Sequence, residues 1–305
     1  MAILVSCLQK LGARVNYYVP NRLEEGYGLH LGPLLEAAAR GVSLVITVDC
    51  GMASVEEVDA ATRAGLEVII TDHHRPADRV PAARCVLNPR VEGAGYPFVE
   101  LSGSGLALKL VHAVEMRTGL SQVEECVDLA ALGAIADVAP LVGENRTIAR
   151  LGLALLSRGE RVGPEALVGV ARLGDGPISA EAVSFAIAPR LNALGRLGNA
   201  TGSVRLLLTK SRVEAWELAA QMEDCHRERQ RLEAAVLSEA VRMIESGAAR
   251  EKDGVIVLYD PQWHGGVVGI VAARLAEMYN RPALLLTSSA EGARGSARSA
   301  PSSPA

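Results

Sequence analysis

The stretch LEVIITDHHRP, residues 66–76, decides the fold of this chain. Its apolar run at 66–70 is typical of a buried strand, and the Arg-Pro pair at its end cannot continue a strand interior. Asp72, His73 and His74 stand between the two. In open α/β sheets, the residues just past the carboxyl ends of the strands carry the chemistry. The stretch therefore predicts a sheet edge that presents one carboxylate and two imidazoles.

A second apolar run, LVITV at 44–48, ends in the same way, because Asp49 follows it directly. Both runs are predominantly apolar rather than alternating, which is typical of parallel strands buried on both faces. The neighbouring segments alternate in type, with helices expected at 2–11, 33–40 and 54–64 and extended segments at 15–19 and 83–87. The first part of the chain is therefore expected to be an α/β domain built on a parallel sheet.

From residue 102 onward the chain is expected to be mostly helical, with helices at 106–118, 123–136, 147–158, 164–172 and 179–187 and a loop at 188–196. A long, highly charged helix at 211–246 would cross the full diameter of a domain and act as a spacer. A smaller α/β unit follows, with a strand at 254–259, a helix at 267–279 and a strand at 283–287. Its tail turns into Ser, Pro and Ala, and this unit is expected to have too few elements to close a core.

Composition limits the function further. With 305 residues, 49% hydrophobic and 22% charged, the chain is expected to be globular. Aromatic residues make up only 3%, which argues against a base-stacking platform, and a net charge of −4 means that any surface for nucleic acid must be local. Five cysteines without a CxxC pair are typical of reduced thiols in the cytoplasm. No apolar run approaches the length of a membrane span and the start does not resemble a signal peptide, so no membrane association is expected.

The candidate metal ligands follow predicted strands or helices, where one rim could gather them: Asp49, Asp72, His73, His74 and Asp137. Carboxylates combined with imidazole suit Mn²⁺, Mg²⁺ or Zn²⁺ better than ions that prefer thiolates. The alternative is that the aspartates are capping or turn residues and that the two histidines form a polar loop. The whole set, with paired histidines directly after an aspartate at a strand end, favours the metal interpretation.

Two further features suit phosphate chemistry. Gly265 and Gly266 open a predicted helix, whose free N–H groups and dipole can bind an anion. Arg298, in the segment GSARS, could bind a phosphate through two nitrogens. The alternatives are a plain turn for the glycine pair, and surface charges for Arg22, Arg190 and Arg196. Cys50 is interpreted as a buried inert thiol, since no dedicated base accompanies it.

These segments together resemble one known family: VITVDCG ending at 51, TDHH at 71–74, SGSGLALKL at 102–110, ALGAIADVAPL at 131–141, APRLNALGR at 188–196, HGGVVGIVAARL at 264–275 and GSARS at 295–299. The family is the DHH/DHHA1 phosphoesterases, and the resemblance is greatest to its bacterial single-strand-specific 5′→3′ exonucleases. It covers nearly the whole chain, and the segment YVPNRLEEGYGL at 18–29 adds to it. The resemblance implies two-metal hydrolysis of single-stranded DNA with Mn²⁺ or Mg²⁺, in DNA repair and recombination.

The resemblance also implies roles for individual residues. Asp49 would bridge two metals, His73 and Asp137 would be further metal ligands, and Asp72 and His74 would be catalytic and orienting residues. Contacts to DNA phosphates are implied for Arg22, Arg190, Asn192, His264, Gly265, Gly266, Ser296 and Arg298. The partners would be single-stranded DNA, a single-strand-binding protein and a helicase, and the protein would be a cytoplasmic monomer.

One departure from the family pattern shapes the expected activity. The family carries an aspartate-rich motif on a strand before the first helix, and no such motif occurs in this sequence. The expected domains are therefore a DHH domain at 1–209 that lacks this strand, a connecting helix at 210–248 and a partial DHHA1 domain at 249–305. Such a chain would hold at most one metal and have impaired activity. Two alternatives stay open: a DHH phosphatase acting on oligoribonucleotides or bisphosphates, and a non-catalytic nucleic-acid-binding fragment.

Overall fold

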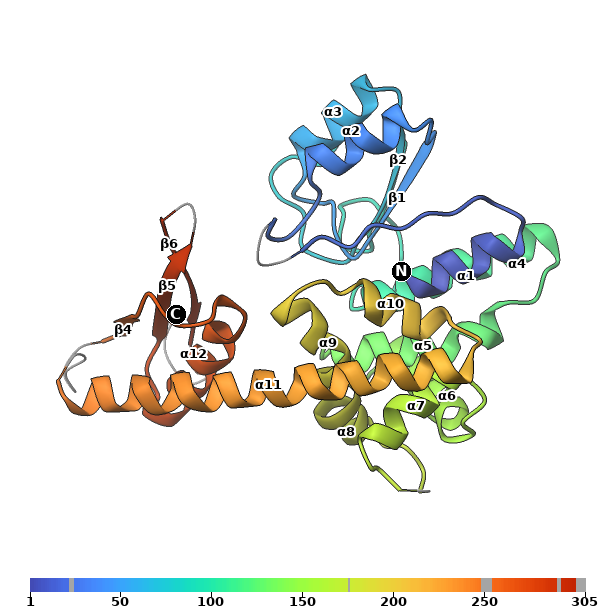
Figure 1. The fold of residues 1–305 in the computed structure, drawn as a ribbon. Coiled ribbons are helices and arrows are strands. Elements are labelled where there is room, and N and C mark those ends of the chain that lie inside the picture. The colour runs from blue at the N-terminus through green and yellow to red at the C-terminus, as the bar shows by residue number, and fades with distance from the viewer. Residues whose placement is uncertain (22–24, 175, 248–253, 290–291, 300–305) are drawn as a thin grey trace.

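The computed structural model describes residues 1–21, 25–174, 176–247, 254–289 and 292–299. The chain forms two lobes that are joined by one long helix, α11 (Arg212–Glu245), as Figure 1 shows. The first lobe contains a small sheet and a larger group of helices, and the second contains a sheet with one helix against it. The long spacer helix predicted from the sequence is therefore confirmed.

The sheet of the first lobe is parallel, with the strand order β1-β2-β3. Its strands are β1 (Leu44–Val48), β2 (Glu67–Thr71) and β3 (Cys85–Leu87). Leu44 pairs with Glu67, and Ile69 pairs with Cys85, so the carboxyl ends of all three strands meet at one edge. The predicted parallel α/β arrangement is confirmed, and that edge is where Asp49 and Asp72 emerge.

Helices cover both faces of this sheet. On one face, α2 (Leu31–Ala39) and α3 (Val55–Arg63) form a small core in which Leu34 and Val58 pack with Val68 and Ile70 of β2. On the other face, Ile46 and Val48 of β1 pack against the main helical core. Residues two apart on a strand point to the same side of the sheet, and adjacent residues point to opposite sides. The residues of one strand therefore contribute alternately to the two cores.

The main core is helical. It is built from α1 (Ala2–Lys10), α4 (Gly103–Thr118), α5 (Val123–Ala136), α6 (Gly143–Ser157), α7 (Val162–Val170), α8 (Ala180–Ala182), the π-helical turn η1 (Val183–Ile187), α9 (Ala188–Leu197) and α10 (Thr201–Leu208). The first third of α11 packs into it through Ala215, Leu218 and Met222. Because α5 ends at Ala136, Asp137 lies at a helix end that faces the sheet edge described above.

Two local predictions were wrong in this lobe. Residues 15–19 run as irregular chain, because a strand needs a hydrogen-bonded neighbour and none of the described residues pairs with them. Residues 188–196, expected to be a loop, belong to α9. Pro189 stands in the first turn of α9, directly after the π-helical turn η1, and the helix is not interrupted there.

The second lobe has a three-stranded sheet in the order β4-β5-β6, with β4 (Ile256–Tyr259) parallel and β6 (Gly292–Arg298) antiparallel to β5 (Ala283–Ser289). Helix α12 (Gly265–Tyr279) packs against β5 and β6. The expectation that this unit could not close a core was wrong. The end of α11 supplies a wall through Val236, Ala240 and Ile244, which pack with the buried residues of β4, β5 and α12.

The strand β6 was missed because its sequence is small and polar. That composition has a structural reason, since a Cβ on Gly295 would lie 2.2 Å from the carbonyl oxygen of Leu285 on the neighbouring strand. The remaining tail, 300–305, lies outside the described residues. Across the described parts of both lobes, no helix is long and apolar enough to cross a membrane.

Candidate metal centre

Asp49 stands in the turn that ends β1, and its backbone has φ of 64°, a left-handed conformation that side chains rarely adopt. The turn is held by two hydrogen bonds: Asp49 N donates to Thr71 O at 2.9 Å, and Thr47 Oγ1 donates to Cys50 O at 2.7 Å. The carboxylate lies against the first turn of α4, because a Cβ on Gly103 would come within 2.5 Å of Asp49 Oδ1. The partial positive charge of that helix end stabilises the carboxylate.

Asp72 is buried, with 2% of its surface exposed, and it orders the loop that carries the two histidines. Its Oδ1 accepts from His73 N at 2.8 Å, His74 N at 3.2 Å and His74 Nδ1 at 2.7 Å. Its Oδ2 accepts from Met52 N at 3.0 Å. Both oxygens therefore accept hydrogen bonds from the protein, and the bond from His74 Nδ1 fixes the orientation of that ring.

His73 lies between two carboxylates from different elements. Its Nε2 is 2.9 Å from Asp49 Oδ1 and 3.5 Å from Asp137 Oδ2, and 15% of the side chain is exposed. The nearby carboxylate of Asp49 is the main cause that raises the pKa of His73, against the opposing effect of burial. Burial raises the pKa of Asp137, and the negative charge of Asp49 adds to that rise while His73 opposes it. The predicted ligands Asp49, His73 and Asp137 thus lie together, although they follow three different elements, β1, β2 and α5.

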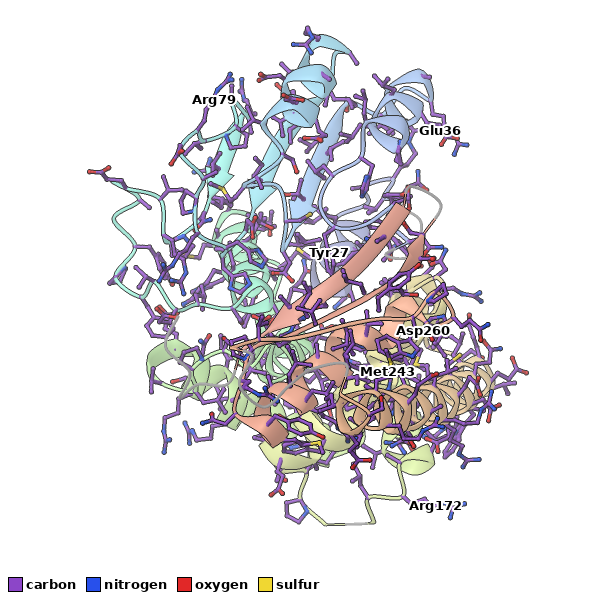
Figure 2. The ribbon with its side chains drawn as sticks, turned by 90° about the vertical axis from the view of Figure 1, so that its left-hand side faces the viewer. Tyr27, Glu36, Arg79, Arg172, Met243 and Asp260 are labelled. Atoms are coloured by element: carbon purple, nitrogen blue, oxygen red, sulfur yellow. The ribbon has the colours of Figure 1, made fainter. Side chains whose placement is uncertain are left out.

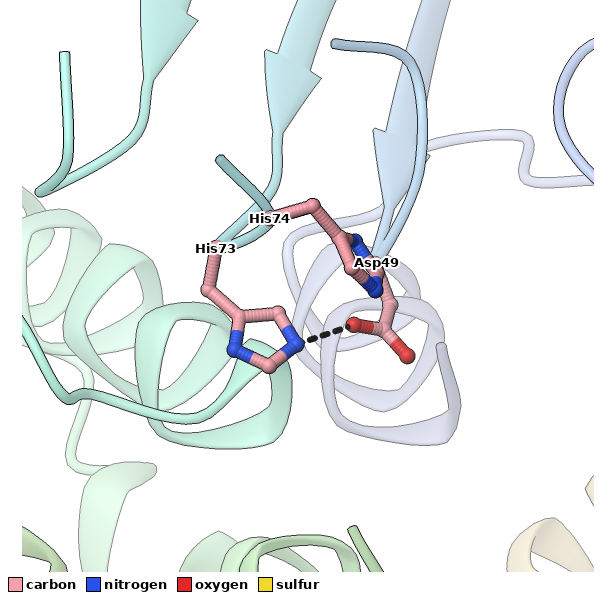
Figure 3. A group of neighbouring side chains, drawn as sticks. All are labelled: Asp49, His73 and His74. Carbon is pink, nitrogen blue, oxygen red and sulfur yellow. Dashed lines mark ion pairs between the residues drawn. The ribbon is translucent and has the colours of Figure 1, made fainter. Parts of the chain in front are cut away.

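The Nε2 atom of His73 is buried, and its approach to Asp49 does not have hydrogen-bond geometry, so it has no proper hydrogen-bond partner. Buried polar atoms of this kind are rare and call for an explanation such as an ion. His74 stands beside His73, with ring centroids 4.8 Å apart. One ligand atom each from Asp49, His73 and His74 lies within 4.8 Å of the others, the group drawn in Figure 3. A carboxylate that holds Nδ1, as Asp72 does for His74, is the usual support of a histidine that binds metal through Nε2.

The predicted phosphate-binding residues divide into two groups. Arg190, on α9, is already paired, since its Nε donates to Glu223 of α11 at 2.6 Å and its Nη1 donates to Ala186 O at 2.8 Å. Each partner of this ion pair has only 13% of its side chain exposed. Asn192 is exposed on the same helix. Arg22 lies outside the described residues.

The second group gathers around α12. His264 caps this helix, because its Nδ1 accepts from Gly266 N at 3.1 Å, and the ring proton is therefore on Nε2. Gly265 is the first residue of the helix. A Cβ on Gly269 would lie 3.1 Å from Ser296 Oγ and 3.4 Å from Arg298 Nη2, so these two side chains of β6 reach over the first turns of α12. His264, Ser296 and Arg298 thus surround one helix N-terminus.

The two lobes meet at this place. A Cβ on Gly266 would lie 2.1 Å from the carbonyl oxygen of Arg196 at the end of α9, so only glycine allows this approach. Arg196 Nη1 donates in return to Gly266 O at 3.3 Å. The glycine pair singled out in the sequence is therefore a packing contact between the lobes as well as a helix N-terminus.

Comparison with known proteins identifies the family. Residues 1–134 match the DHH family, N-terminal domain. A solved structure of exonuclease RecJ bound to manganese superimposes with a TM-score of 0.86 and 39% identity, over 98% of this chain and 74% of that chain. The chain belongs to the RecJ branch of the DHH family.

Other RecJ proteins agree with this assignment. RecJ of Thermus thermophilus in complex with Mn²⁺ superimposes with a TM-score of 0.81 and 37% identity, over 98% of this chain and 42% of that one. The single-stranded-DNA-specific exonuclease RecJ of Bacillus subtilis is 42% identical over 301 residues, and that of Escherichia coli is 36% identical over 315 residues. This chain covers 37% and 54% of these two curated relatives.

The sequence predicted the candidate donor residues but not the groups that hold them in place. Gly103 and Thr47 support Asp49, and Met52 N holds Asp72. Gly103 belongs to the SGSG segment noted in the sequence, so the signal was present. Its role depends on how closely α4 approaches β1, which the sequence does not show.

Proposed function

We propose that this RecJ-family chain hydrolyses phosphodiester bonds of single-stranded DNA from the 5′ end with a divalent cation, in DNA repair and recombination. The observation that carries the proposal is the convergence of Asp49, His73 and Asp137 at one sheet edge, with His73 Nε2 buried and lacking a proper partner. The names of the relatives supply the substrate class, as single-stranded-DNA-specific exonucleases.

The donor set fits Mn²⁺ or Mg²⁺. Two carboxylates and an imidazole are hard or borderline ligands, and the described part of the site places no thiolate among them. Ligands that share one octahedral ion at about 2.1 Å stand about 3 Å apart, and the Asp49–His73 and His73–Asp137 separations are 2.9 Å and 3.5 Å. We propose that Asp49, His73 and Asp137 hold one cation, with His74 Nε2 as a further donor. RecJ structures with manganese and magnesium support the choice of metal.

Different residues of the chain have different proposed roles in the reaction. When bound, a divalent cation polarises a phosphoryl oxygen and lowers the pKa of water. His74 carries its proton on Nδ1 when it donates to Asp72, so its Nε2 presents a lone pair to the proposed cation. His264 can donate from Nε2 to a phosphate oxygen, and Arg298 can neutralise phosphate charge.

We propose that the second lobe is the DHHA1 substrate-binding domain and that 1–209 is the DHH domain, with α11 between them. The grouping of His264, Ser296 and Arg298 around the N-terminus of α12 supports this assignment. A single-strand-binding protein and a helicase are proposed partners from the family, and a monomer is the proposed state. Five free cysteines support a reducing, cytoplasmic setting.

Calorimetric titration with MnCl₂ tests the metal site directly. We expect the chain to bind Mn²⁺ and Asp49→Ala to lose this binding. Asp59→Ala is the matched control, because Asp59 pairs with Arg79 on the surface of α3 and does not belong to the site. Absence of Mn²⁺ binding, or binding that Asp49→Ala leaves unchanged, contradicts the proposed centre.

Hydrolysis tests the substrate. We expect a long single strand labelled at its 3′ end to shorten slowly from its 5′ end in Mn²⁺, because one cation rather than two is proposed at the site, and a duplex of the same sequence to stay intact. Preference for a short oligoribonucleotide or a nucleoside bisphosphate would instead indicate a DHH phosphatase. Binding of the single strand without hydrolysis would indicate a non-catalytic nucleic-acid-binding protein.

A further inference from the structure

A hollow of about 410 Å³ opens beside the metal centre and is lined by His73, His74, Arg75, Arg90 and Glu100. Its two arginines come from the chain after β2 and the chain after β3, whereas the phosphate-binding residues discussed above lie on α12 and β6. Figure 2 shows that the segment between β2 and α4 lies to one side of the strands of the second lobe. The hollow is therefore lined by other segments than the group of residues around α12 and β6.

Arg75 directly follows the two histidines and is exposed. Within the described residues it has no ion-pair partner, so its guanidinium is free to bind a ligand. A guanidinium can donate two parallel hydrogen bonds to phosphate, which suits it to this ligand.

Arg90 is held in place by the same loop that carries the metal ligands. Its backbone N donates to Asn88 Oδ1 at 2.8 Å, and Asn88 Nδ2 donates to His74 O at 2.9 Å. Asn88 is 4% exposed, so this connection is buried and fixed. The Arg90 guanidinium donates to Glu100 at 2.7 Å, and the side chains of this pair stay 26% and 40% exposed. Arg90 is therefore positioned at the hollow and remains accessible.

The charges of the hollow favour an anion. Among the residues that line it, two guanidiniums face one carboxylate, whereas the carboxylates that contact the two histidines belong to the proposed metal centre, where a cation would offset their charge. The rings in the lining are those of the two histidines, and no Phe, Tyr or Trp among the described residues belongs to it. A base would find no broad stacking surface here, and contact with the sugar-phosphate backbone is favoured instead.

We propose that this hollow binds an internal phosphodiester of the single strand, next to the phosphate at the metal centre, through Arg75 and Arg90. The inference rests on the proposed function and names one part of the substrate path. The strand would contact α12 and β6 on one side of the metal centre and the hollow on the other. Because the contacts are to phosphate, they apply to any base sequence.

Equilibrium binding tests the hollow without hydrolysis. The probe is a single-stranded oligothymidylate with fluorescein at its 3′ end, followed by anisotropy in EDTA at several salt concentrations. We expect Arg75→Gln to weaken binding several-fold and to reduce the slope of log K against log salt by roughly 0.7, the share of one phosphate contact. Arg90→Gln should reduce the slope less, because Glu100 already neutralises part of its charge.

Three controls decide the outcome. Arg79 lies in the same loop but pairs with Asp59 outside the hollow, so Arg79→Gln should leave both the affinity and the salt slope unchanged. Arg75→Lys keeps the charge and should retain the slope. Oligonucleotides with a 5′-hydroxyl or a 5′-phosphate should respond equally to Arg75→Gln. An unchanged slope in Arg75→Gln, or an effect seen only with the 5′-phosphate, would overturn the proposal.

The test is independent of the exonuclease activity. A chain that hydrolyses single strands but binds them equally well without Arg75 contradicts the hollow and leaves the proposed function intact. A chain that binds single strands through Arg75 but never hydrolyses them contradicts the proposed function and leaves the hollow intact.

Discussion

At the scale of single residues, the site depends on one buried carboxylate whose two oxygens both accept hydrogen bonds from the protein. Asp72 accepts four hydrogen bonds, three from the histidine pair and one from Met52 N in the turn after β1. It therefore ties the two strand ends together and fixes the ring of His74. His73, by contrast, has a buried nitrogen that the protein leaves without proper hydrogen-bond geometry. The two neighbouring residues therefore differ, since the protein satisfies the polar atoms of Asp72, whereas His73 is proposed to bind a cation.

Asp72→Asn should weaken both the fold and metal binding. An amide group in this position replaces an acceptor with a donor facing backbone N–H groups, which costs about 1–3 kcal/mol of unfolding free energy. Because His74 then loses its fixed orientation, we expect Mn²⁺ affinity to fall roughly 10–100-fold. Urea denaturation and calorimetry measure the two effects. Full stability together with wild-type Mn²⁺ affinity would show that Asp72 does not order the loop.

At the scale of elements, glycines decide how closely helices approach the site. Gly103 lets the first turn of α4 rest against Asp49, and Gly266 lets α12 rest against the end of α9. The long helix α11 contributes to both hydrophobic cores, so it is a structural part of each lobe as well as a connection. The Arg190–Glu223 pair, at 2.6 Å, fastens α9 to α11.

Gly103→Ala should displace Asp49. The new Cβ would meet Oδ1 at 2.5 Å, so the carboxylate must shift from the position that it holds beside His73. We expect Mn²⁺ affinity to fall at least roughly tenfold, while the helical circular dichroism signal stays intact because alanine favours helices. Gly32→Ala is the matched control, since a Cβ there, also in the first turn of a helix, meets nothing within 4 Å. Equal Mn²⁺ affinity in the two variants would contradict this account.

Glu223→Gln should reduce the acid sensitivity of the fold. Burial alone would raise the pKa of Glu223, but hydrogen bonds from Arg190 and Arg227 outweigh it and hold the pKa below its ordinary value. A carboxyl group with a lowered folded pKa stabilises the fold above the unfolded pKa of about 4.5, and this stabilisation is lost as the pH falls through the folded pKa. We therefore expect the variant to be less stable than wild type by about 1–2 kcal/mol at pH 7, and the difference to shrink at pH 3.

Urea denaturation at the two pH values measures this difference. Glu160→Gln is a suitable control, because its pair with Arg158 is exposed and long, at 4.0 Å. A constant difference between wild type and Glu223→Gln from pH 7 to pH 3 would exclude the proposed linkage.

At the scale of the whole molecule, a net charge of −4 means that the overall field does not attract DNA. Binding must depend on local positive groups, on β6 and α12 and in the hollow beside the histidines. The two lobes are joined by α11 and also meet where Arg196 contacts Gly266. The positions of these positive groups relative to the metal centre are therefore set by the packing of the lobes.

Arg298→Ala should weaken single-strand binding. It should also reduce the slope of log K against log salt by roughly 0.7, the share of one phosphate contact on a single strand. Its Nη1 donates to Ser296 Oγ at 2.6 Å, so the side chain is oriented along β6 beside α12. Anisotropy titrations at several salt concentrations measure the slope. Arg242→Ala, which removes an exposed arginine at the end of α11, serves as the control. The same slope in wild type and Arg298→Ala would place Arg298 outside the binding surface.

The sequence by itself determined the parallel sheet, the long helix and the identity of the candidate ligands. Continuous apolar runs such as 44–48 leave a chain few ways to be buried, and a polar residue directly after such a run must stand at the sheet edge. Tertiary structure alone decided the rest. It made β6 a strand through its pairing with β5, and it turned Arg190 toward Glu223. It also placed Arg75 and Arg90 at one hollow, because contacts between distant segments depend on packing distances that local sequence patterns do not encode.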